Sequence, residues 1–428
     1  MPTDIVPLKQ TKSPLIAWCL FEIGPVLVAM AFPIIFGPYF ITHMAVNNII
    51  GTHEWGNAVA LAALISCLSP IVGAFADCSG RHKYWLFFFN SLFIICIALL
   101  WFAYPNPHYV NFSLSCVVIG ALGLEITIVF YNAFLPQVAL PNYFGRVSGW
   151  SMGLGIIVSA VILLILLFTL IKHPPIWLDV NSAEHIRICG PIIAFLIVIF
   201  SLPFFMFVPD RPSTKRNFKQ ILTGGLNELK STIKSLPSQK NITLYLIAHL
   251  FYTDGLTTLS AFSGIYLAGI FKMSLSEIII FGIVSNTASG VGAIIFSWLS
   301  DWIGSKLTVL IFLIFSIILG IPLLITHNII TFWILAIMLS LILGSVVSTS
   351  RSLMANIIDL SKTTEMFGLY SLSGRVTAFL GPWTLGLVTF YFNSQRAGMA
   401  TIIVFLIIGT IFLYFVRDNK ARESEVIA

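Results

Sequence analysis

The sequence predicts an all-α membrane protein with twelve transmembrane helices in two pseudo-symmetric six-helix bundles, and three observations predict this fold. The chain is 58% hydrophobic and only 9% charged. Soluble domains carry about 25% charged residues, so lipid must surround most of this chain. Its apolar segments are each long enough, at roughly 20 residues, to cross a bilayer as a helix. A turn built from the same residue types occurs once in each half of the chain.

Twelve apolar segments are expected to cross the membrane. Each is long and continuous, which favours helices, because strands of a membrane barrel would be about ten residues long and would alternate in polarity. In chain order the segments cover approximately residues 15–42, 56–77, 84–104, 112–135, 147–171, 188–208, 243–270, 276–300, 307–326, 329–350, 368–391 and 398–416.

The first and the eleventh segments contain helix breakers. Pro25, Pro33 and Pro38 lie in the first, and Gly374 and Gly381 lie in the eleventh. Proline removes a backbone donor and kinks a helix. In lipid, such a kink survives only where neighbouring groups or a wet cavity satisfy the freed carbonyls. We therefore expect both segments to flank a central cavity.

The repeated turn places an aspartate, then a glycine three residues later, then positive charge, at the end of a membrane segment. Its members are Asp77, Gly80, Arg81 and Lys83 after the second segment, and Asp301, Gly304 and Lys306 after the eighth. A basic polar linker, 209–242, separates an N-terminal bundle, 1–208, from a C-terminal bundle, 243–428. Parallel repeats of this kind place a substrate site at their interface, near the middle of the bilayer.

The distribution of lysine and arginine predicts that both termini are cytoplasmic. With the N-terminus inside, 19 of the 23 lysines and arginines lie on the cytoplasmic side. The net charge of +6 then reflects this topology and an attraction to anionic lipid headgroups, and it does not indicate nucleic-acid binding. A cleavable signal peptide is not expected, because the first apolar run is too long.

Three carboxylates, Glu22, Glu125 and Asp254, lie at membrane depth. Charge at that depth is costly, so each needs a reason. Lysine and arginine are absent at matching depth from the segments that carry these acids, and an unpaired buried carboxylate tends to hold a proton. We expect these acids, above all Glu22 and Asp254 at corresponding positions of the two halves, to bind protons or a substrate amine. The alternative is a neutral carboxyl group hydrogen-bonded to a neighbouring helix.

Side chains on nearby helical faces extend this candidate site. The expected cavity-lining residues are Tyr131, Asn132, Phe251, Thr257, Thr258 and Asn286. The alternative, commoner for serine and threonine, is that polar groups only join helices. Arg351 is expected to form a cytoplasmic gate with the repeated turns, by pairing with Asp77, Asp301 or helix C-termini when the cytoplasmic side is closed, and the alternative is the positive-inside rule alone. For Arg146 and Arg375 the positive-inside rule alone is the favoured explanation.

Gly145, Gly149 and Gly153 form a small-residue face, which predicts close packing of the fifth segment on a neighbour. This face is not a nucleotide-binding loop, because no strand precedes it and no Lys-Ser/Thr follows. The sequence has no Walker motif, no HExxH, no Ser/His/Asp set and no metal-ligand spacing, and its six cysteines include no CxxC pair. We therefore expect no enzymatic activity, no cofactor and no metal.

The two repeated turns resemble those of the major facilitator superfamily. Within this superfamily, the chain also resembles the vacuole-effluxer-like group. The second resemblance is carried by FYNAFLPQVA, FGRVSG, FYTDGLTTLSAFSGIYLAGIF, STSRSLMANII and FGLYSLSGRVTAFLGP, and it extends over essentially the whole chain. It implies the major facilitator fold. Fungal members are implicated in exporting amino acids from the vacuole, which implies efflux of an amino acid or a similar metabolite.

One stretch departs from the group. Relatives usually carry Tyr-Asp-Trp-Ala-Asn-Ser in the first segment, where this chain has FEIGPV from Phe21 to Val26. The acid is kept as Glu22, but the tryptophan, asparagine and serine are lost. If those residues touch substrate in relatives, the substrate of this protein differs.

We therefore predict a secondary active transporter of a small organic solute, proton-coupled and working by alternating access, with efflux preferred. A proton-symport uptake carrier and a solute sensor that binds without transport are the alternatives. The expected partners are the solute, protons and membrane lipid, without nucleic acid, and the chain is expected to be a monomer. The expected location is the inner (plasma) membrane of a bacterium.

Overall fold

The computed structural model describes residues 12–45, 48–66, 68–210, 238–273, 275–358 and 362–417, together with 230, 231, 234 and 236. Regular structure in these residues is helical. The N-terminal half consists of α1 (Lys12–Phe21), α2 (Ile23–Ala31), η1 (Phe32–Phe36), α3 (Gly37–Tyr39), η2 (Phe40–Met44), α4 (Asn48–Ser66), α5 (Ser69–Ser79), α6 (His82–Leu99), η3 (Leu100–Phe102), η4 (Pro107–Tyr109), α7 (Val110–Ala133), α8 (Leu135–Val138), η5 (Pro141–Tyr143), α9 (Phe144–Leu166), η6 (Leu167–Ile171), α10 (Glu184–Arg187) and α11 (Cys189–Phe207). The C-terminal half consists of α13 (Lys240–Ile270), α14 (Leu275–Ile303), α15 (Ser305–Ile325), α16 (Ile329–Ile357), α17 (Thr363–Ser373), α18 (Leu380–Phe392) and α19 (Gln395–Tyr414).

Each predicted membrane segment coincides with a helix or with consecutive helices, and the all-helical fold class is confirmed. Among the described residues, 9 helical segments are long and apolar enough to cross a membrane. Most of the predicted linker, residues 211–229, lies outside the described residues, so the division at 209–242 stays a prediction.

The two predicted breaks are present. The first span changes to π-helical turns at Phe32–Phe36 and Phe40–Met44, around Pro33 and Pro38. The eleventh span stops at the end of α17 and resumes at α18, with turns between them. A third break, between α4 and α5 in the second span, was not predicted, although Pro70 in the first turn of α5 is its local signal.

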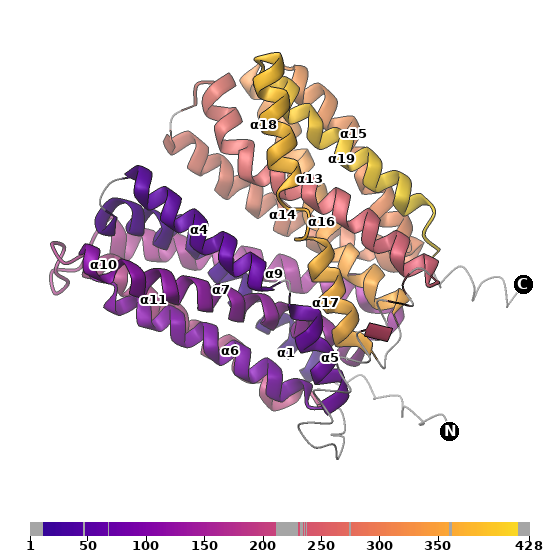
Figure 1. Cartoon of the computed structure of the whole chain (residues 1–428), viewed down its shortest axis with the longest axis horizontal. Helices are drawn as coiled ribbons and strands as arrows, with labels where there is room; N and C mark the ends of the chain where they lie inside the picture. The colour runs from indigo at the N-terminus through magenta and orange to yellow at the C-terminus, as the bar shows by residue number, and fades with distance from the viewer. Residues whose placement is uncertain are drawn as a thin grey trace, which may run out of the picture.

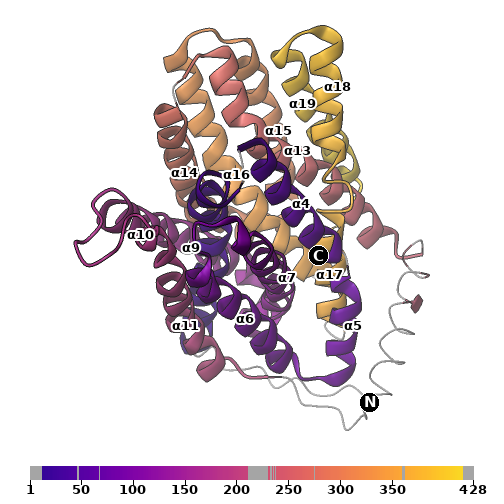
Figure 2. The ribbon, with the colours of Figure 1, turned by 60° about the vertical axis from the view of Figure 1, so that its left-hand side comes forward.

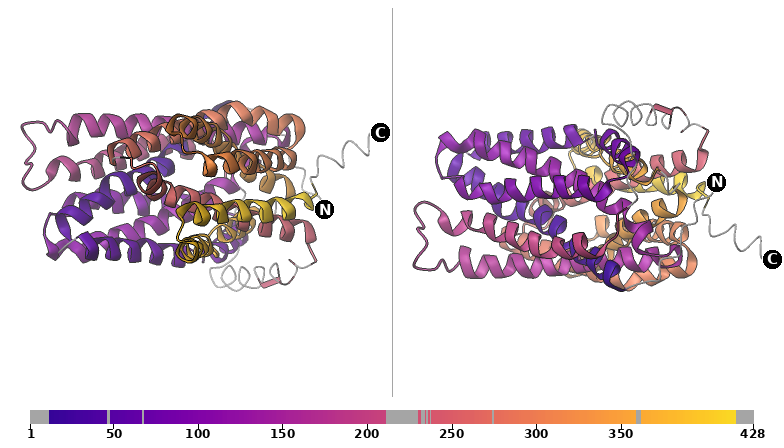
Figure 3. Two further views of the ribbon diagram at one scale, coloured as in Figure 1. Left: turned by 90° about the horizontal axis from the view of Figure 1, so that it is seen from above. Right: turned by 90° about the horizontal axis from the view of Figure 1, so that it is seen from below.

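Figure 1 shows the helices of the N-terminal half, in indigo to magenta, and those of the C-terminal half, in salmon to yellow, as two groups. The groups meet where α9 packs against α14 and α16, and where α5 and α7 pack against α17. The pairing of α5 with α17 is visible in Figure 2. In the views of Figure 3, from above and below, the long helices of each half lie alongside one another. The interface between the halves therefore depends on a few helices from each.

The repeated turns have a conformation that requires glycine. Gly80 has φ 68° and Gly304 has φ 94°, values that residues with a side chain rarely adopt. Gly80 ends α5, and its N–H bonds to the carbonyl of Ala76 at 2.9 Å. We call the end of the molecule that carries these two glycines the turn end.

Candidate functional site

The centre of the candidate site is a buried ion pair between the halves. Arg351 of α16 donates from Nη1 to Oε2 of Glu22, which lies between α1 and α2, at 2.8 Å. Glu22 is 8% exposed and Arg351 is 5% exposed. A charge this deeply buried is tolerated when it is paired and hydrogen-bonded, and both conditions hold here.

The guanidinium of Arg351 also binds the N-terminal half through its other nitrogens. Nε donates to Ser148 Oγ at 2.8 Å, and Nη2 donates to the Ser148 carbonyl at 2.8 Å. Nη1 also donates to Asn132 Oδ1 at 3.2 Å. The planar fork of arginine suits such a set of acceptors, so its position is fixed by several contacts on α7 and α9.

Glu22 and Arg351 rest against an aromatic wall. Trp18 and Tyr131 stack with ring centroids 4.4 Å apart, and the Arg351 Cζ lies 5.0 Å from the Trp18 ring. Ser151 donates to Glu22 Oε2 at 3.1 Å and is hydrogen-bonded to the Tyr131 hydroxyl at 2.6 Å. The Trp18 ring adds a cation–π contribution to the position of Arg351. The Glu22 carboxylate accepts hydrogen bonds from two donors, Arg351 and Ser151.

A second ion pair between the halves is more accessible. Glu125 of α7 pairs with Arg375, which lies in the turns between α17 and α18. The Arg375 side chain is 30% exposed and that of Glu125 is 18% exposed. The pair therefore joins the N-terminal half to the break in the eleventh span, and it is less buried than the pair of Glu22 and Arg351.

The third acid has a different environment. Asp254 is 0% exposed, and its Oδ2 accepts a hydrogen bond of 3.0 Å from the N–H of Gly381, at the start of α18. Its Oδ1 has no hydrogen-bond partner within the described chain, and neither has the buried hydroxyl of Thr258. Unlike Glu22 and Glu125, Asp254 forms no ion pair with any described residue.

The expectation that the deep acids are unpaired is wrong for Glu22 and Glu125. Their arginines come from the tenth and eleventh spans, in the other half of the chain. The position of a charged residue along its own span does not show which residues of other helices pack against it. The expected partners of Arg351, Asp77 and Asp301, are also wrong, since Arg351 pairs with Glu22.

Each half caps a helix of the other half through the aspartate of its turn. Asp77 accepts from the N–H groups of Thr364 (3.3 Å) and Glu365 (2.8 Å), in the first turn of α17. Asp301 accepts from the N–H groups of Gly145 (2.8 Å) and Arg146 (3.0 Å), in the first turn of α9. A carboxylate at a helix N-terminus satisfies orphan donors and complements the helix dipole. The duplicated turn is thus a reciprocal clasp that closes the turn end.

Arg146 belongs to this clasp, contrary to the expectation that it only follows the positive-inside rule. Its Nε donates to Asp301 Oδ2 at 2.8 Å. Its Cζ also lies 4.8 Å from the ring of Tyr143 and 4.7 Å from that of Trp298. Asp77 instead has a side-chain partner within its own half, because His82 Nε2 lies 2.7 Å from Asp77 Oδ1.

The lysines of the two turns contact their own halves. Lys83 Nζ donates to the carbonyls of Phe205 and Val208 at the end of α11, at 2.7 Å each. Lys306 Nζ donates to the carbonyl of Tyr414 at the end of α19, at 2.9 Å. Cations at helix C-termini are favourable. These contacts assign both lysines to cohesion within a bundle, and Arg81 is exposed.

The predicted close packing of Gly145, Gly149 and Gly153 is confirmed, and the neighbour is α14 of the other half. A Cβ at Gly149 would lie 2.3 Å from the Ala293 carbonyl oxygen and 2.3 Å from the Ser297 Cβ. Only a residue without a side chain lets α9 approach α14 this closely.

The predicted cavity-lining residues have different environments. Tyr131 and Asn132 belong to the Glu22–Arg351 cluster, and Thr258 is buried beside Gly381. Phe251 instead packs on Phe405 and Phe412 of α19, within its own half. The other two, Thr257 and Asn286, are exposed and bond to carbonyls of their own helices, those of Asp254 and Gly282.

Three residues of the central cluster, Trp18, Ser148 and Ser151, were not among the predicted site residues. Ser148 and Ser151 lie within the small-residue stretch GRVSGWSMGLG. The glycines of this stretch predicted close helix packing. Because the two serines lie between these glycines, they could have been expected at the same interface. Trp18 precedes Glu22 by four residues, one helical turn, on the same helix face.

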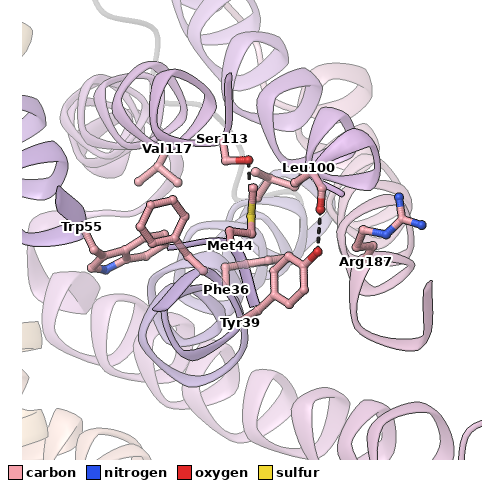
Figure 4. A pocket seen from close by; sticks show the side chains of 10 residues that line it. Phe36, Tyr39, Met44, Trp55, Leu100, Ser113, Val117 and Arg187 are labelled. Carbon is pink, nitrogen blue, oxygen red and sulfur yellow. Dashed lines mark hydrogen bonds between the residues drawn. The ribbon is translucent and has the colours of Figure 1, made fainter. Parts of the chain in front are cut away.

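Figure 4 shows a pocket inside the N-terminal half, away from the ion pairs. Its lining includes Phe36, Tyr39, Met44 and Trp55, and its volume is about 10 Å³. The guanidinium of Arg187 points away from Met44 and donates to the Trp101 carbonyl at 2.8 Å. A cavity of this size holds about one water molecule, so it is not a solute site.

Comparison with known proteins agrees with this architecture. The profile of the family described as "Vacuole effluxer Atg22 like" matches residues 57–426. The MFS-type transporter YxiO of Bacillus subtilis is 26% identical over 86% of this chain and 85% of its own length. Autophagy-related protein 22 of Yarrowia lipolytica is 21% identical over 67% of this chain. The match covers only 53% of the length of the fungal protein.

Solved structures show the same fold at low identity. The fucose transporter FucP in its outward conformation aligns with a TM-score of 0.74 and 12% identity, over 95% of this chain and 99% of that one. The proton:xylose symporter XylE aligns with a TM-score of 0.72 and 12% identity, over 95% of each chain. The predicted fold and family are therefore confirmed: this chain is a multi-pass membrane transporter of the major facilitator superfamily and belongs to the vacuole effluxer Atg22-like family.

Proposed function

We propose that this transporter exports a small organic solute, such as an amino acid or a related metabolite, in a proton-coupled cycle of alternating access. The preference for export rests on membership of a family described as vacuole effluxers. We also propose that the protein is a monomer in the inner membrane of a bacterium. Cytoplasmic termini are proposed because 19 of the 23 lysines and arginines then lie on the cytoplasmic side.

The observation that carries the alternating-access proposal is the reciprocal clasp formed by Asp77 and Asp301. Each carboxylate binds two backbone N–H groups of the opposite half. The Glu22–Arg351 pair lies on the same interface, between α1 and α16. The described conformation is therefore one in which the turn end is closed, and export requires a second conformation in which these contacts are broken.

Proton coupling is supported by the three acids of the membrane region. Protonation of Glu22 would remove the charge that Arg351 binds, and protonation of Glu125 would do the same for Arg375. Asp254, buried without an ion-pair partner among the described residues, is the acid best suited to carry a proton through the cycle.

The test is transport by purified protein in proteoliposomes. A thermal-shift screen against amino acids, nucleosides and organic acids first identifies a ligand, and counterflow of that ligand then measures transport. We expect Asp254→Asn to keep counterflow but to lose the pH dependence of net transport. Glu22→Gln, compared at equal amounts of folded protein, should lose this pH dependence as well. Wild-type rate and pH profile in both variants would remove the proton role. A ligand that stabilises the protein but shows no counterflow would identify a sensor instead.

A further inference from the structure

We propose that proton binding to Asp254 releases the N-terminus of α18 and so frees this half of the eleventh span to move. The inference rests on the proton-coupled function proposed above and names the element that the proton moves. The proton binds Oδ1 of the carboxylate. What it weakens is the bond between Oδ2 and the N–H of Gly381, because the acceptor loses its charge.

The deprotonated acid is matched to the start of a helix. α18 begins at Leu380, after the turns that interrupt the span, so its first N–H groups have no partners within the helix. Asp254 Oδ2 accepts one of them, from Gly381, at 3.0 Å. A carboxylate at this position stabilises the helix through both the hydrogen bond and the helix dipole.

Thr258 is the polar neighbour of this carboxyl group. Asp254 Oδ1 and Thr258 Oγ1 are both buried, and both lack a hydrogen-bond partner in the described part of the chain. A Cβ on Gly381 would lie 3.0 Å from that Oδ1 and 2.0 Å from that Oγ1, so both oxygens border the same glycine. A threonine hydroxyl can accept a hydrogen bond from a neutral carboxyl group or donate one to a carboxylate. Once the start of α18 moves, this hydroxyl would be within the reach of the Asp254 carboxyl group that has lost its bond to Gly381.

Other titratable and charged groups near α13 are engaged elsewhere. On α13 itself, His249 Nδ1 is hydrogen-bonded to Ser373 Oγ at the end of α17, at 2.8 Å. Of the helices packed against α13, α16 carries Arg351, which pairs with Glu22. Arg375, in the turns before α18, pairs with Glu125. Tyr370 of α17 packs against His249. On α19, Arg396 binds the carbonyls of residues 324–326, and on α14 Glu277 is exposed near the start of the helix. The start of α18 is thus the group that faces the Asp254 charge.

α18 packs on α19 along its length, and Gly398 of α19 allows a close approach to Leu385 and Thr389. At its N-terminal end, the bond from Gly381 to Asp254 connects it to α13. The turns before α18 also contain Arg375, the partner of Glu125, so movement there reaches the interface between the halves.

The experiment is hydrogen–deuterium exchange of the purified full-length protein, followed in peptides from residues 375–392 and corrected for intrinsic exchange rates. Without added solute, we expect protection of the first amides of α18 to fall as the pH is lowered from about 8 to about 5, the range in which buried carboxyl groups titrate. Protection of α19 stays constant as an internal reference. Unchanged protection of α18 across this range would overturn the inference without any variant.

Three variants sharpen the test. Asp254→Asn mimics the neutral acid, so its α18 amides exchange fast at every pH. Thr258→Val removes the hydroxyl beside the Asp254 carboxyl group, so the midpoint of the loss of protection shifts. Thr384→Val is the matched control, because the Thr384 hydroxyl bonds only to carbonyls of its own helix, and it keeps the wild-type midpoint. Equal protection in Asp254→Asn and the wild type, or equal shifts in the two threonine variants, contradicts the inference.

The two proposals fail separately. If Asp254→Asn abolishes proton coupling but leaves α18 protection unchanged, the release of α18 by the proton is overturned and the proposed function stands. If α18 protection follows pH through Asp254 while transport keeps its pH profile in the Asn variant, the release of α18 is supported and proton coupling through Asp254 is not.

Discussion

Arg351 and Glu22 are 329 residues apart in the chain, yet the guanidinium of one donates to the carboxylate of the other at 2.8 Å. The bond crosses the interface between the two halves. Because both side chains are buried, it cannot be exchanged for water while the turn end stays closed. We expect opening of that end to separate these two charges and to leave each without its counter-ion.

Removal of one charge of this pair is predicted to be strongly destabilising. Glu22→Gln leaves the Arg351 charge buried without its counter-ion and should lower the stability of the closed protein by about 3–5 kcal/mol. The measurement is the thermal unfolding midpoint in detergent. Ser151→Ala, which removes only one hydrogen bond to Glu22, should cost about 1 kcal/mol.

Removing both charges is predicted to cost less than the sum of the two single changes. In a double-mutant cycle with Arg351→Met, the doubly changed protein should recover about 0.5–3 kcal/mol relative to additivity, because neither charge is then left alone. Strict additivity would show that the two side chains do not interact in the folded protein.

The Glu125–Arg375 pair is predicted to contribute little to stability. Both side chains are partly exposed, and solvent screening limits such pairs to about 0–1 kcal/mol. Glu125→Gln should therefore shift the unfolding midpoint much less than Glu22→Gln does under the same conditions. A shift as large as that of Glu22→Gln would show that the pair is sealed from solvent.

Gly149→Ala is predicted to force the halves apart. Its Cβ would collide with the Ala293 carbonyl, and overpacking of this kind costs about 1–3 kcal/mol. Gly282→Ala on α14 is the matched control, because no atom of the described residues outside the backbone of its own helix lies within 4 Å of its Cβ position. The control should be neutral or slightly stabilising, as alanine favours helices. Equal midpoints for both variants would contradict the close approach of α9 and α14.

Asp77→Asn and Asp301→Asn are predicted to favour opening of the turn end. Each removes a charge that caps a helix of the other half, an interaction of up to about 2 kcal/mol in partly buried sites. Spin labels at the exposed positions Arg81 and Trp302 would report the separation of the halves by pulsed electron resonance. Both variants should enlarge the long-distance population, whereas Asp179→Asn, in an exposed loop, should leave it unchanged. Distance distributions identical to the wild type would show that the clasp does not hold this end closed.

Much of the candidate site could be recognised from the sequence, but its connections could not. Glu22, Glu125 and Asp254 stand out because charge in an apolar segment is locally visible. The interpretation that all three are unpaired fails for two of them, since Arg351 and Arg375 come from other spans. Position along one helix says nothing about which residue of a distant helix lies opposite.

The sequence by itself determined where the helices lie and where the first and eleventh spans break. Helix length follows from the length of each apolar segment. The break in the first span follows from Pro33 and Pro38, and the conformation of the two turns follows from their glycines, because these residues act on the backbone within a few residues. The tertiary structure alone decided that Asp77 and Asp301 each cap a helix of the opposite half, and that Glu22 meets Arg351. These contacts depend on how α9 packs on α14 and α5 on α17, and that packing is a property of two surfaces together.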